Sequence, residues 1–416
     1  MFCNVECELE HINASLINER KISIEAYVRS TANVFKNEEF EFVQSVENRA
    51  DIQTIKKVEN VEKSIYNTSK NISSNSELKI SLEKNQIEKI VKFDYLLHKK
   101  DVKLYDDKVL YSCYAKVNVL YKAEESRELH LLEDDIFISD EEDVVGISPD
   151  LNCDFNFNVV NVDCEIAQDD LGENRIINIS LDIKSDVKIS KSEEIEVIED
   201  AYSPEKELVL IKEKSVFDVR YGCGCTETIA KDNVKLDDED PVLILSSKGE
   251  IVSIDSEVNE GSVNIEGTLK VNCLYKSSDE EKEFGNKEID LPFSAVIDIP
   301  GLTEDMDVVV KGNLESIQGA IEAGTIAVKG ILSFDAKASY KEEKEYINTI
   351  EENEECDAPK KKASVTIYVV ESGDTLWKLA KKYNTTMQAI ASANDMELED
   401  TLEIGTKLII PGRALI

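Results

Sequence analysis

The sequence is short of basic residues and of long apolar runs, and each shortage excludes a class of partner. Its 86 acidic residues outnumber its 48 lysines and arginines, which leaves a formal net charge of −38. Such a chain repels phosphate backbones and anionic lipids, so we predict no nucleic-acid partner. The longest aliphatic run is about four residues, at 242–245, whereas a membrane span needs about 20. We therefore predict no direct membrane insertion.

Histidine is equally scarce, and this argues against catalysis. His11, His98 and His130 lie in different segments without the spacing of metal ligands. The glycines at 319–326 resemble those of a phosphate-binding loop, but the lysine that such a loop needs is missing. No nucleophile lies near a base in a recognisable pattern. The sequence predicts a protein that is not an enzyme and that holds no metal and no cofactor.

The nine cysteines are odd in number and scattered, which favours free thiols in a reducing compartment. Cys223 and Cys225 in "YGCGC", joined by Cys3 and Cys7, are the alternative: a four-thiolate zinc site. Their spacings depart from the usual two-residue gap, so free thiols at a turn are the favoured interpretation. The first 20 residues lack the basic and apolar regions of a secretory signal. We expect a soluble protein that stays in the cytosol.

What the sequence does contain is an internal repeat of strand patterns. "LYSCYAKVNVLYK" at 110–122 aligns with "NIEGTLKVNCLYK" at 264–276 at an offset of 154, and apolar residues alternate with polar ones in both. Alternation with period two is typical of a half-buried β-strand. The first apolar face holds Val109, Tyr111, Ala115, Val117, Val119 and Tyr121; the second holds Val263, Ile265, Leu269, Val271, Cys273 and Tyr275.

A second alternating pattern occurs three times, at 22–28, 177–183 and 326–336, and 62–66 resembles 213–217. These correspondences predict two full units of about 150 residues and a preceding half-unit. A misplaced start codon or the loss of an ancestral first half would explain an N-terminus in the middle of a repeat. Polar turns between the strands favour antiparallel β-sandwiches or barrel-like units, and hence a mainly β fold.

The change in pattern along the chain predicts its domain limits. We expect a partial β unit at 1–50, full repeats at 51–203 and 204–350, a charged linker at 351–364 and a small α+β module at 365–416.

The C-terminal module has the pattern of a βααβ unit. A strand "IYVV" is followed by a turn, with Asp374 placed to cap a first helix, and Thr385 is expected to cap a second. Gly405 precedes a last strand, "KLIIP". The first helix has one apolar face at helical spacing, made of Leu376, Leu379, Ala380 and Tyr383.

Two resemblances follow from these residues. "YVVESGDTLWKLAKKY", Asn394 and "IGTKLIIP" resemble a LysM domain over the whole module. "GTLKVNCLYK…EIDLPFSAVIDIPG" resembles the SPOCS domain of bacterial spore-coat morphogenetic proteins over roughly 245–340, with a weaker match over 95–190 and a partial one over 1–50.

The LysM resemblance implies a shallow groove between two loops that binds N-acetylglucosamine-containing glycans, chiefly peptidoglycan and chitin. Backbone amides read the acetamido groups there and an apolar floor accepts the methyl. The implied groove consists of Gly373, Asp374, Thr375 and Leu376 on one wall, Asn394, Asp395, Met396, Glu397 and Leu398 on the other, and Ile410 below.

Trp377, the only tryptophan, points about 100° away from the core face of the first helix. One interpretation is a platform on which a sugar ring stacks. The favoured one is a large residue that shields the helix against the linker or the last strand, because a small module needs all the buried area it can find.

The SPOCS–LysM arrangement is similar to that of SipL-type and SpoVID-type spore-coat morphogenetic proteins. It implies a scaffold in the mother-cell cytosol that encases the forespore by binding basement-layer proteins of the spore coat. The LysM module would bind such a protein, a peptidoglycan-type glycan, or both. The alternative is a wall-associated peptidoglycan-binding protein or an accessory subunit of a cell-wall hydrolase.

Overall fold

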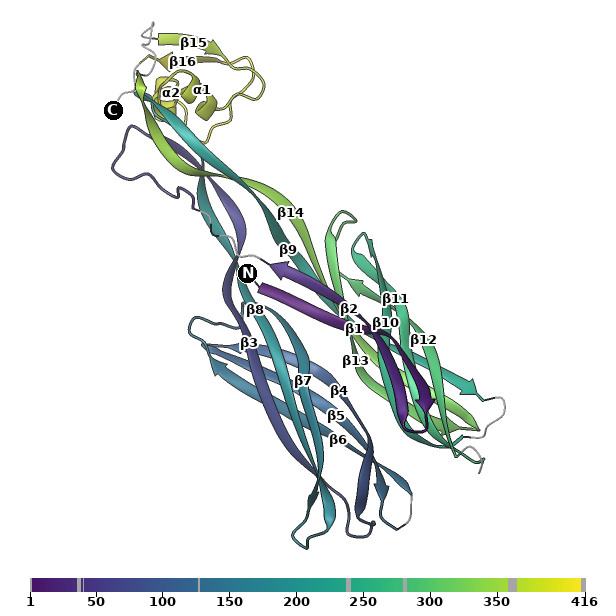
Figure 1. The fold of residues 1–416 in the computed structure, drawn as a ribbon. Helices are drawn as coiled ribbons and strands as arrows, with labels where there is room; N and C mark the ends of the chain where they lie inside the picture. Colours follow the sequence, from purple (N-terminus) through teal and green to yellow (C-terminus); the bar gives the residue numbers. More distant parts are fainter. Residues whose placement is uncertain are drawn as a thin grey trace. The chain divides into compact units, whose positions relative to one another are not determined.

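The computed structural model describes residues 2–35, 39, 41–125, 128–236, 241–279, 283–357 and 365–412. These residues are mostly strand, and two short helices lie near the C-terminus (Figure 1). The chain divides into two compact units, of which the first comprises Met1–Lys36, Glu62–Ser192 and Val219–Tyr340 and the second Asn37–Val61, Glu193–Asp218 and Lys341–Ile416. The prediction of a mainly β fold that ends in a small α+β module is confirmed.

The first unit contains two sandwiches of antiparallel strands, each built from a pair of three-stranded sheets. In the first sandwich, β4 (Ile87–Tyr105), β5 (Lys108–Ala123) and β6 (Leu129–Asp143) form one sheet. The other sheet has the order β3 (Gln53–Lys79), β8 (Asn174–Tyr202), β7 (Asn152–Gln168).

The second sandwich repeats this plan. One sheet consists of β10 (Pro241–Asn259), β11 (Ser262–Ser277) and β12 (Phe284–Asp298). The other has the order β13 (Asp307–Glu322), β14 (Thr325–Asp357), β9 (Lys206–Lys235).

The predicted alternation places the core of each sandwich. Tyr111 and Tyr121 on β5 are fully buried, as is Val271 on β11. Each of these central strands packs its apolar face against the opposite sheet, so that Ile177 and Ile326 lie in the two cores. The repeated strand patterns therefore mark the interiors of two equivalent sandwiches.

The connections follow the predicted turn chemistry. β4 and β5 are joined at Asp106–Asp107, and Asp107 takes a positive φ of 55°. At the equivalent turn between β10 and β11, Gly261 has a φ of 80°, which costs a residue without a side chain little.

The N-terminal segment forms a two-stranded hairpin of β1 (Phe2–Asn18) and β2 (Lys21–Phe35). β2 carries the same alternating pattern as β8, yet Ile22 is 61% exposed where Ile177 is 0% exposed. In the described residues no second sheet covers this face.

The second unit contains the remaining parts of the four longest strands, 53–61, 193–202, 206–218 and 341–357, which we call the strand bundle. Ile198, Ala201 and Ile347 form its core. β14 continues to Asp357, so strand occupies 351–357 of the predicted linker, and 358–364 lie outside the described residues. Each of these strands runs through both units, so the division into units does not test the predicted domain limits. Those limits stay a prediction.

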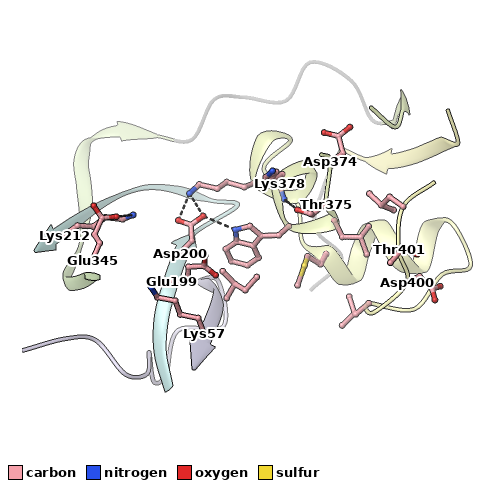
Figure 2. Close-up of a pocket in the computed structure, with 17 residues that line it drawn as sticks. Lys57, Glu199, Asp200, Lys212, Glu345, Asp374, Thr375, Lys378, Asp400 and Thr401 are labelled. Atoms are coloured by element: carbon pink, nitrogen blue, oxygen red, sulfur yellow. Dashed lines mark hydrogen bonds and ion pairs between the residues drawn. The ribbon is translucent and has the colours of Figure 1, made fainter. Parts of the chain in front are cut away.

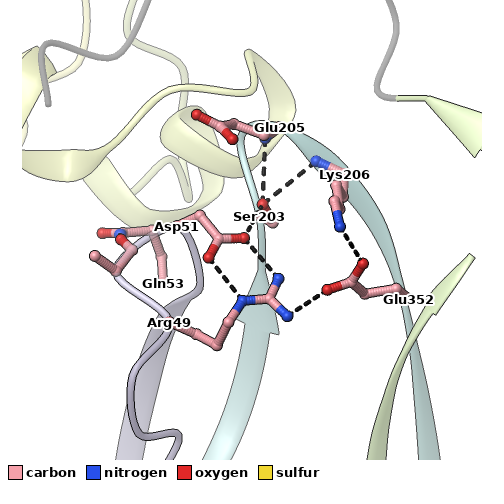
Figure 3. A network of polar contacts seen from close by, with 8 residues as sticks. Arg49, Asp51, Gln53, Ser203, Glu205, Lys206 and Glu352 are labelled. Atoms are coloured by element: carbon pink, nitrogen blue, oxygen red, sulfur yellow. Dashed lines mark hydrogen bonds and ion pairs between the residues drawn. The ribbon is translucent and has the colours of Figure 1, made fainter.

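A polar network ties the chain turns at the end of the bundle together (Figure 3). The Arg49 guanidinium donates to both carboxylate oxygens of Asp51, at 2.9 and 2.8 Å, and pairs with Glu352. Ser203 donates to Asp51 and accepts from the backbone of the next turn. The hydrogen bond from Arg49 lowers the pKa of Asp51 to about 2, so this network is charged at neutral pH.

The C-terminal module consists of β15 (Val365–Val369), α1 (Leu376–Lys382), α2 (Met387–Ala393) and β16 (Lys407–Pro411). The two strands pair antiparallel. The βααβ order predicted from the sequence is confirmed.

Candidate binding site in the C-terminal module

The first loop of the module is shaped by Asp374, although not in the predicted way. The helix cap of α1 is Thr375, whose hydroxyl accepts the Lys378 N–H at 3.2 Å. Asp374 instead accepts the Glu371 N–H at 2.8 Å and the Tyr368 hydroxyl at 2.9 Å, which closes the turn. The expected Asp374 cap is therefore wrong by one residue, because a carboxylate that folds back on its own turn is unavailable to the helix.

These hydrogen bonds set the ionisation of the loop. The Glu371 N–H and then the Tyr368 hydroxyl hold the pKa of Asp374 below its ordinary value. The same contact raises the pKa of Tyr368 to about 12. Asp374 is thus a carboxylate at neutral pH whose main role is to hold the loop.

The second helix also begins one residue later than predicted. Thr386 caps α2 by accepting the Ala389 N–H at 3.1 Å. Thr385 is buried, and its N–H donates to the carbonyl of Ala380, so it closes α1 and does not start α2.

The second loop is held by Asn394. Its amide donates to the carbonyls of Ile390 (2.7 Å) and Ile409 (2.8 Å), and its oxygen accepts the Ile409 N–H at 2.7 Å. All of these bonds go to backbone atoms, so the side chain ties the end of α2 to β16. Its role is to position the loop that follows.

Trp377 is only 8% exposed, and it packs against Tyr202 of the strand bundle. Its ring lies edge-to-face on Tyr202 with centroids 4.9 Å apart, and its indole N–H donates to Asp200 at 2.9 Å. Lys381, one turn later on α1, reaches both oxygens of Asp200 at 2.7 Å. Trp377 is thus buried, as the favoured interpretation expected, and its ring and indole N–H contact Tyr202 and Asp200 of β8, which the sequence did not predict.

The environment of Asp200 keeps it charged. Burial alone would raise the pKa of this carboxyl, but the hydrogen bonds from Lys381 and Trp377 outweigh burial and hold the pKa below its ordinary value. A third contact, from the Tyr202 hydroxyl to the Thr385 carbonyl at 2.8 Å, fixes the other side of the junction. The module and the end of β8 thus share one small core.

A cavity of about 1120 Å³ lies beside this junction (Figure 2). Its lining is shared between the loops of the module and the strand bundle. The module contributes Asp374, Thr375, Leu376, Trp377, Lys378, Lys381, Met387, Leu398, Asp400, Thr401 and Leu402; the bundle contributes Ile55, Lys57, Glu199, Asp200, Lys212 and Glu345.

The structure brings four of the ten predicted groove residues to this cavity: Asp374, Thr375, Leu376 and Leu398. Met396 packs against the core of the module and Ile410 is buried within it. Gly373, Asp395 and Glu397 belong to the two loops without lining the cavity, with Gly373 and Asp395 at positive φ. Ligand binding by the ten residues stays a prediction.

The sequence offered no way to find the bundle side of the site. Asp200 and Tyr202 precede Trp377 by more than 170 residues, and they join it only through the tertiary fold. The stretch 400–402 begins two residues after the predicted wall and was missed because the implied groove ended at Leu398.

Family models match three segments of the chain. One for the "SipL, SPOCS domain" matches residues 86–167 and 242–322, and one for the "LysM domain" matches 368–411. The chain carries two SipL-type SPOCS domains and a LysM domain. The suspected domain composition is confirmed, and no solved structure was found to match the chain.

The SPOCS matches cover β4–β7 and β10–β13, which are the equivalent parts of the two sandwiches. Both SPOCS and LysM are binding domains and not catalytic ones. SPOCS domains of this type occur in sporulation proteins, and LysM is a domain type that binds peptidoglycan and related N-acetylglucosamine glycans.

The remaining candidates from the sequence form no second centre in the described residues. Cys223 and Cys225 are exposed free thiols, but they lie within β9, so the expected turn is wrong. The side chains of Cys3 and Cys7 lie outside the described residues. In the described parts of the chain no group of three histidine, cysteine or acidic side chains is arranged to hold a metal ion. No helix among them is long and apolar enough to cross a bilayer.

Proposed function

We propose that this protein is a non-enzymatic scaffold of the spore coat, which docks on the forespore surface from the mother-cell cytosol. Its LysM domain recognises a basement-layer coat protein, a GlcNAc-containing glycan, or both. The observation that carries the proposal is the combination of two SPOCS domains with a LysM domain whose loops border a cavity large enough for a ligand.

The distribution of charge supports this division of labour. Residues 363–416 hold five basic and seven acidic residues, whereas residues 1–350 carry a net charge of −34. A strongly acidic body resists nonspecific contacts with anionic polymers, and it suits docking to a basic or polar partner. Recognition of an uncharged sugar is then left to the nearly neutral module.

The cavity lining supports ligand binding of a mixed kind. Leu376, Leu398 and Leu402 give it an apolar part, and Thr375 and Thr401 add hydroxyls. Apolar surface with a few fixed polar groups is the usual composition of a site for an acetamido sugar or a peptide.

Co-sedimentation of the full chain with insoluble peptidoglycan tests whether the LysM domain binds glycan. Leu398→Ser should weaken binding several-fold because Leu398 is half exposed at the cavity. Leu171→Ser, at an exposed turn of the first sandwich, is the matched control and should bind normally. Equal binding by both variants, or no binding by the parent chain, would remove glycan recognition from the proposal.

A further inference from the structure

The cavity beside the LysM domain has a second wall that no LysM domain contains by itself. On this wall lie Lys57 of β3, Glu199 of β8, Lys212 of β9 and Glu345 of β14 (Figure 2). Ile55 of β3 lines the same cavity. These residues come from four different strands, so the wall exists only where the bundle is folded.

The junction at Trp377 holds this wall at a fixed place. Trp377, Lys381 and Asp200 all line the cavity, and Asp200 accepts the indole N–H and pairs with Lys381. The indole ring also packs on Tyr202. Ile55 also packs against the core of the module. A ligand in the groove of the LysM domain therefore meets the bundle wall without any rearrangement of the chain.

The wall differs in chemistry from the loops that face it. Lys212 pairs with Glu345 at 2.8 Å, with 39% and 40% of their side chains exposed, and Lys57 pairs with Glu59 at 2.6 Å. Glu199 is exposed beside them. Both signs of charge are thus available to a ligand. Lys212 and Glu345 form an exposed pair that is weak enough to exchange partners, and 32% of the Lys57 side chain is exposed although Glu59 is mostly buried.

An uncharged sugar chain gains no charge contacts from this wall, because an uncharged ring cannot replace either member of an ion pair. A short peptide with carboxylates and an ammonium group can replace both, and its alkyl parts can cover Ile55. Peptidoglycan carries peptides of this kind on its sugars, whereas chitin does not.

We propose that the strand bundle forms a second subsite, which binds the charged peptide attached to the glycan held by the LysM loops. The proposal rests on the glycan binding proposed above. It assigns specificity to Lys57 and Lys212: their ammonium groups pair with the carboxylates of the peptide, while Glu199 and Glu345 accept its ammonium group.

Calorimetric titration of the full chain tests this with two probes that share the same sugars. One is a peptidoglycan oligosaccharide with its peptides intact. The other is the same oligosaccharide after an amidase has removed the peptides, with the lactyl carboxylates that this hydrolysis frees converted to uncharged methyl amides. The parent chain should bind the first about threefold to tenfold more tightly, which is the range expected for two exposed charge contacts. Lys57→Ala combined with Lys212→Ala should abolish that preference, measured as the ratio of the variant's affinities for the two probes.

Lys214→Ala is the matched control, because Lys214 lies on the same strand, pairs with Glu343 at 2.7 Å and does not line the cavity. It should keep the preference. A parent chain that binds both probes equally, or a Lys214→Ala variant that loses the preference as well, would overturn the second subsite while leaving glycan binding intact. Failure of both probes to bind the parent chain would instead refute the glycan binding on which the subsite depends.

Discussion

At the scale of single residues, Trp377 joins the LysM domain to the strand bundle. Its burial could be predicted from the sequence, because a module of this size has few other large apolar side chains. Its partners could not be predicted, because Asp200 and Tyr202 end a strand far away in the sequence and carry no local pattern that marks them. The helix caps were misassigned for a similar reason: Asp374 and Thr375 are both good caps, and only the fold of the turn decides between them.

The junction predicts the effect of removing its carboxylate. Asp200→Ala deletes the acceptor for the Trp377 indole and the partner of Lys381. The free energy needed to separate the LysM domain from the strand bundle should therefore fall by about 1–3 kcal/mol. The chain has one tryptophan, so the fluorescence emission of the protein reports the environment of Trp377. In the Asp200→Ala variant the emission maximum should shift to longer wavelength. Glu199→Ala, at the exposed neighbour, should leave the emission unchanged, and a red shift in both variants would contradict this role for Asp200.

The same carboxylate predicts a pH dependence. The folded pKa of Asp200 lies below its ordinary value of 3.8, so its stabilisation is complete above about pH 4 and is lost as the pH falls through the folded pKa. In dilute solution the emission of Trp377 should stay constant from pH 7 to about 5 and shift only in more acidic solution. An Asp200→Asn variant should lack this step. A parent chain that titrates near neutral pH would show that another group controls the junction.

At the scale of elements, period-two alternation identified the central strands of both sandwiches, because each has one face against a core and one face toward solvent. Alternation did not predict how the long strands β3, β8, β9 and β14 divide between two units, since a strand keeps the same period whichever core it enters. The exposed face of the N-terminal hairpin is a second case in which alternation alone did not predict burial. Its pattern matches that of a buried sheet, but a pattern contains no information about whether a covering sheet is present.

Disrupting the first helix of the LysM domain should unfold that domain and leave the sandwiches folded. Leu379 is 1% exposed in the core of the module, and truncation of a buried leucine to alanine costs about 2–5 kcal/mol. A unit of this size has only a few kcal/mol of stability, so Leu379→Ala should unfold the module. Circular dichroism should still show the β signal of the sandwiches, while Trp377 emission moves to longer wavelength. Loss of the β signal as well would mean that the sandwiches depend on the module.

At the scale of the whole molecule, two SPOCS domains and a LysM domain are combined with a strongly acidic surface. The domain composition was predicted from short motifs, since the LysM and SPOCS patterns depend on local turns and strand periods that the sequence contains. The bundle wall of the cavity was not, because it depends on contacts between strands distant in the sequence. The LysM loops of the cavity are therefore recognisable in the sequence, whereas the bundle wall opposite them is not.

The central claim is that the LysM domain directs the protein to the forespore, and imaging of fluorescently tagged variants in a sporulating host tests it most directly. The parent chain and the Leu171→Ser control should surround the forespore, whereas Leu379→Ala should remain soluble and diffuse in the mother cell. Normal encasement by Leu379→Ala, with the module shown to be unfolded by its Trp377 emission, would contradict the account and assign localisation to the SPOCS domains.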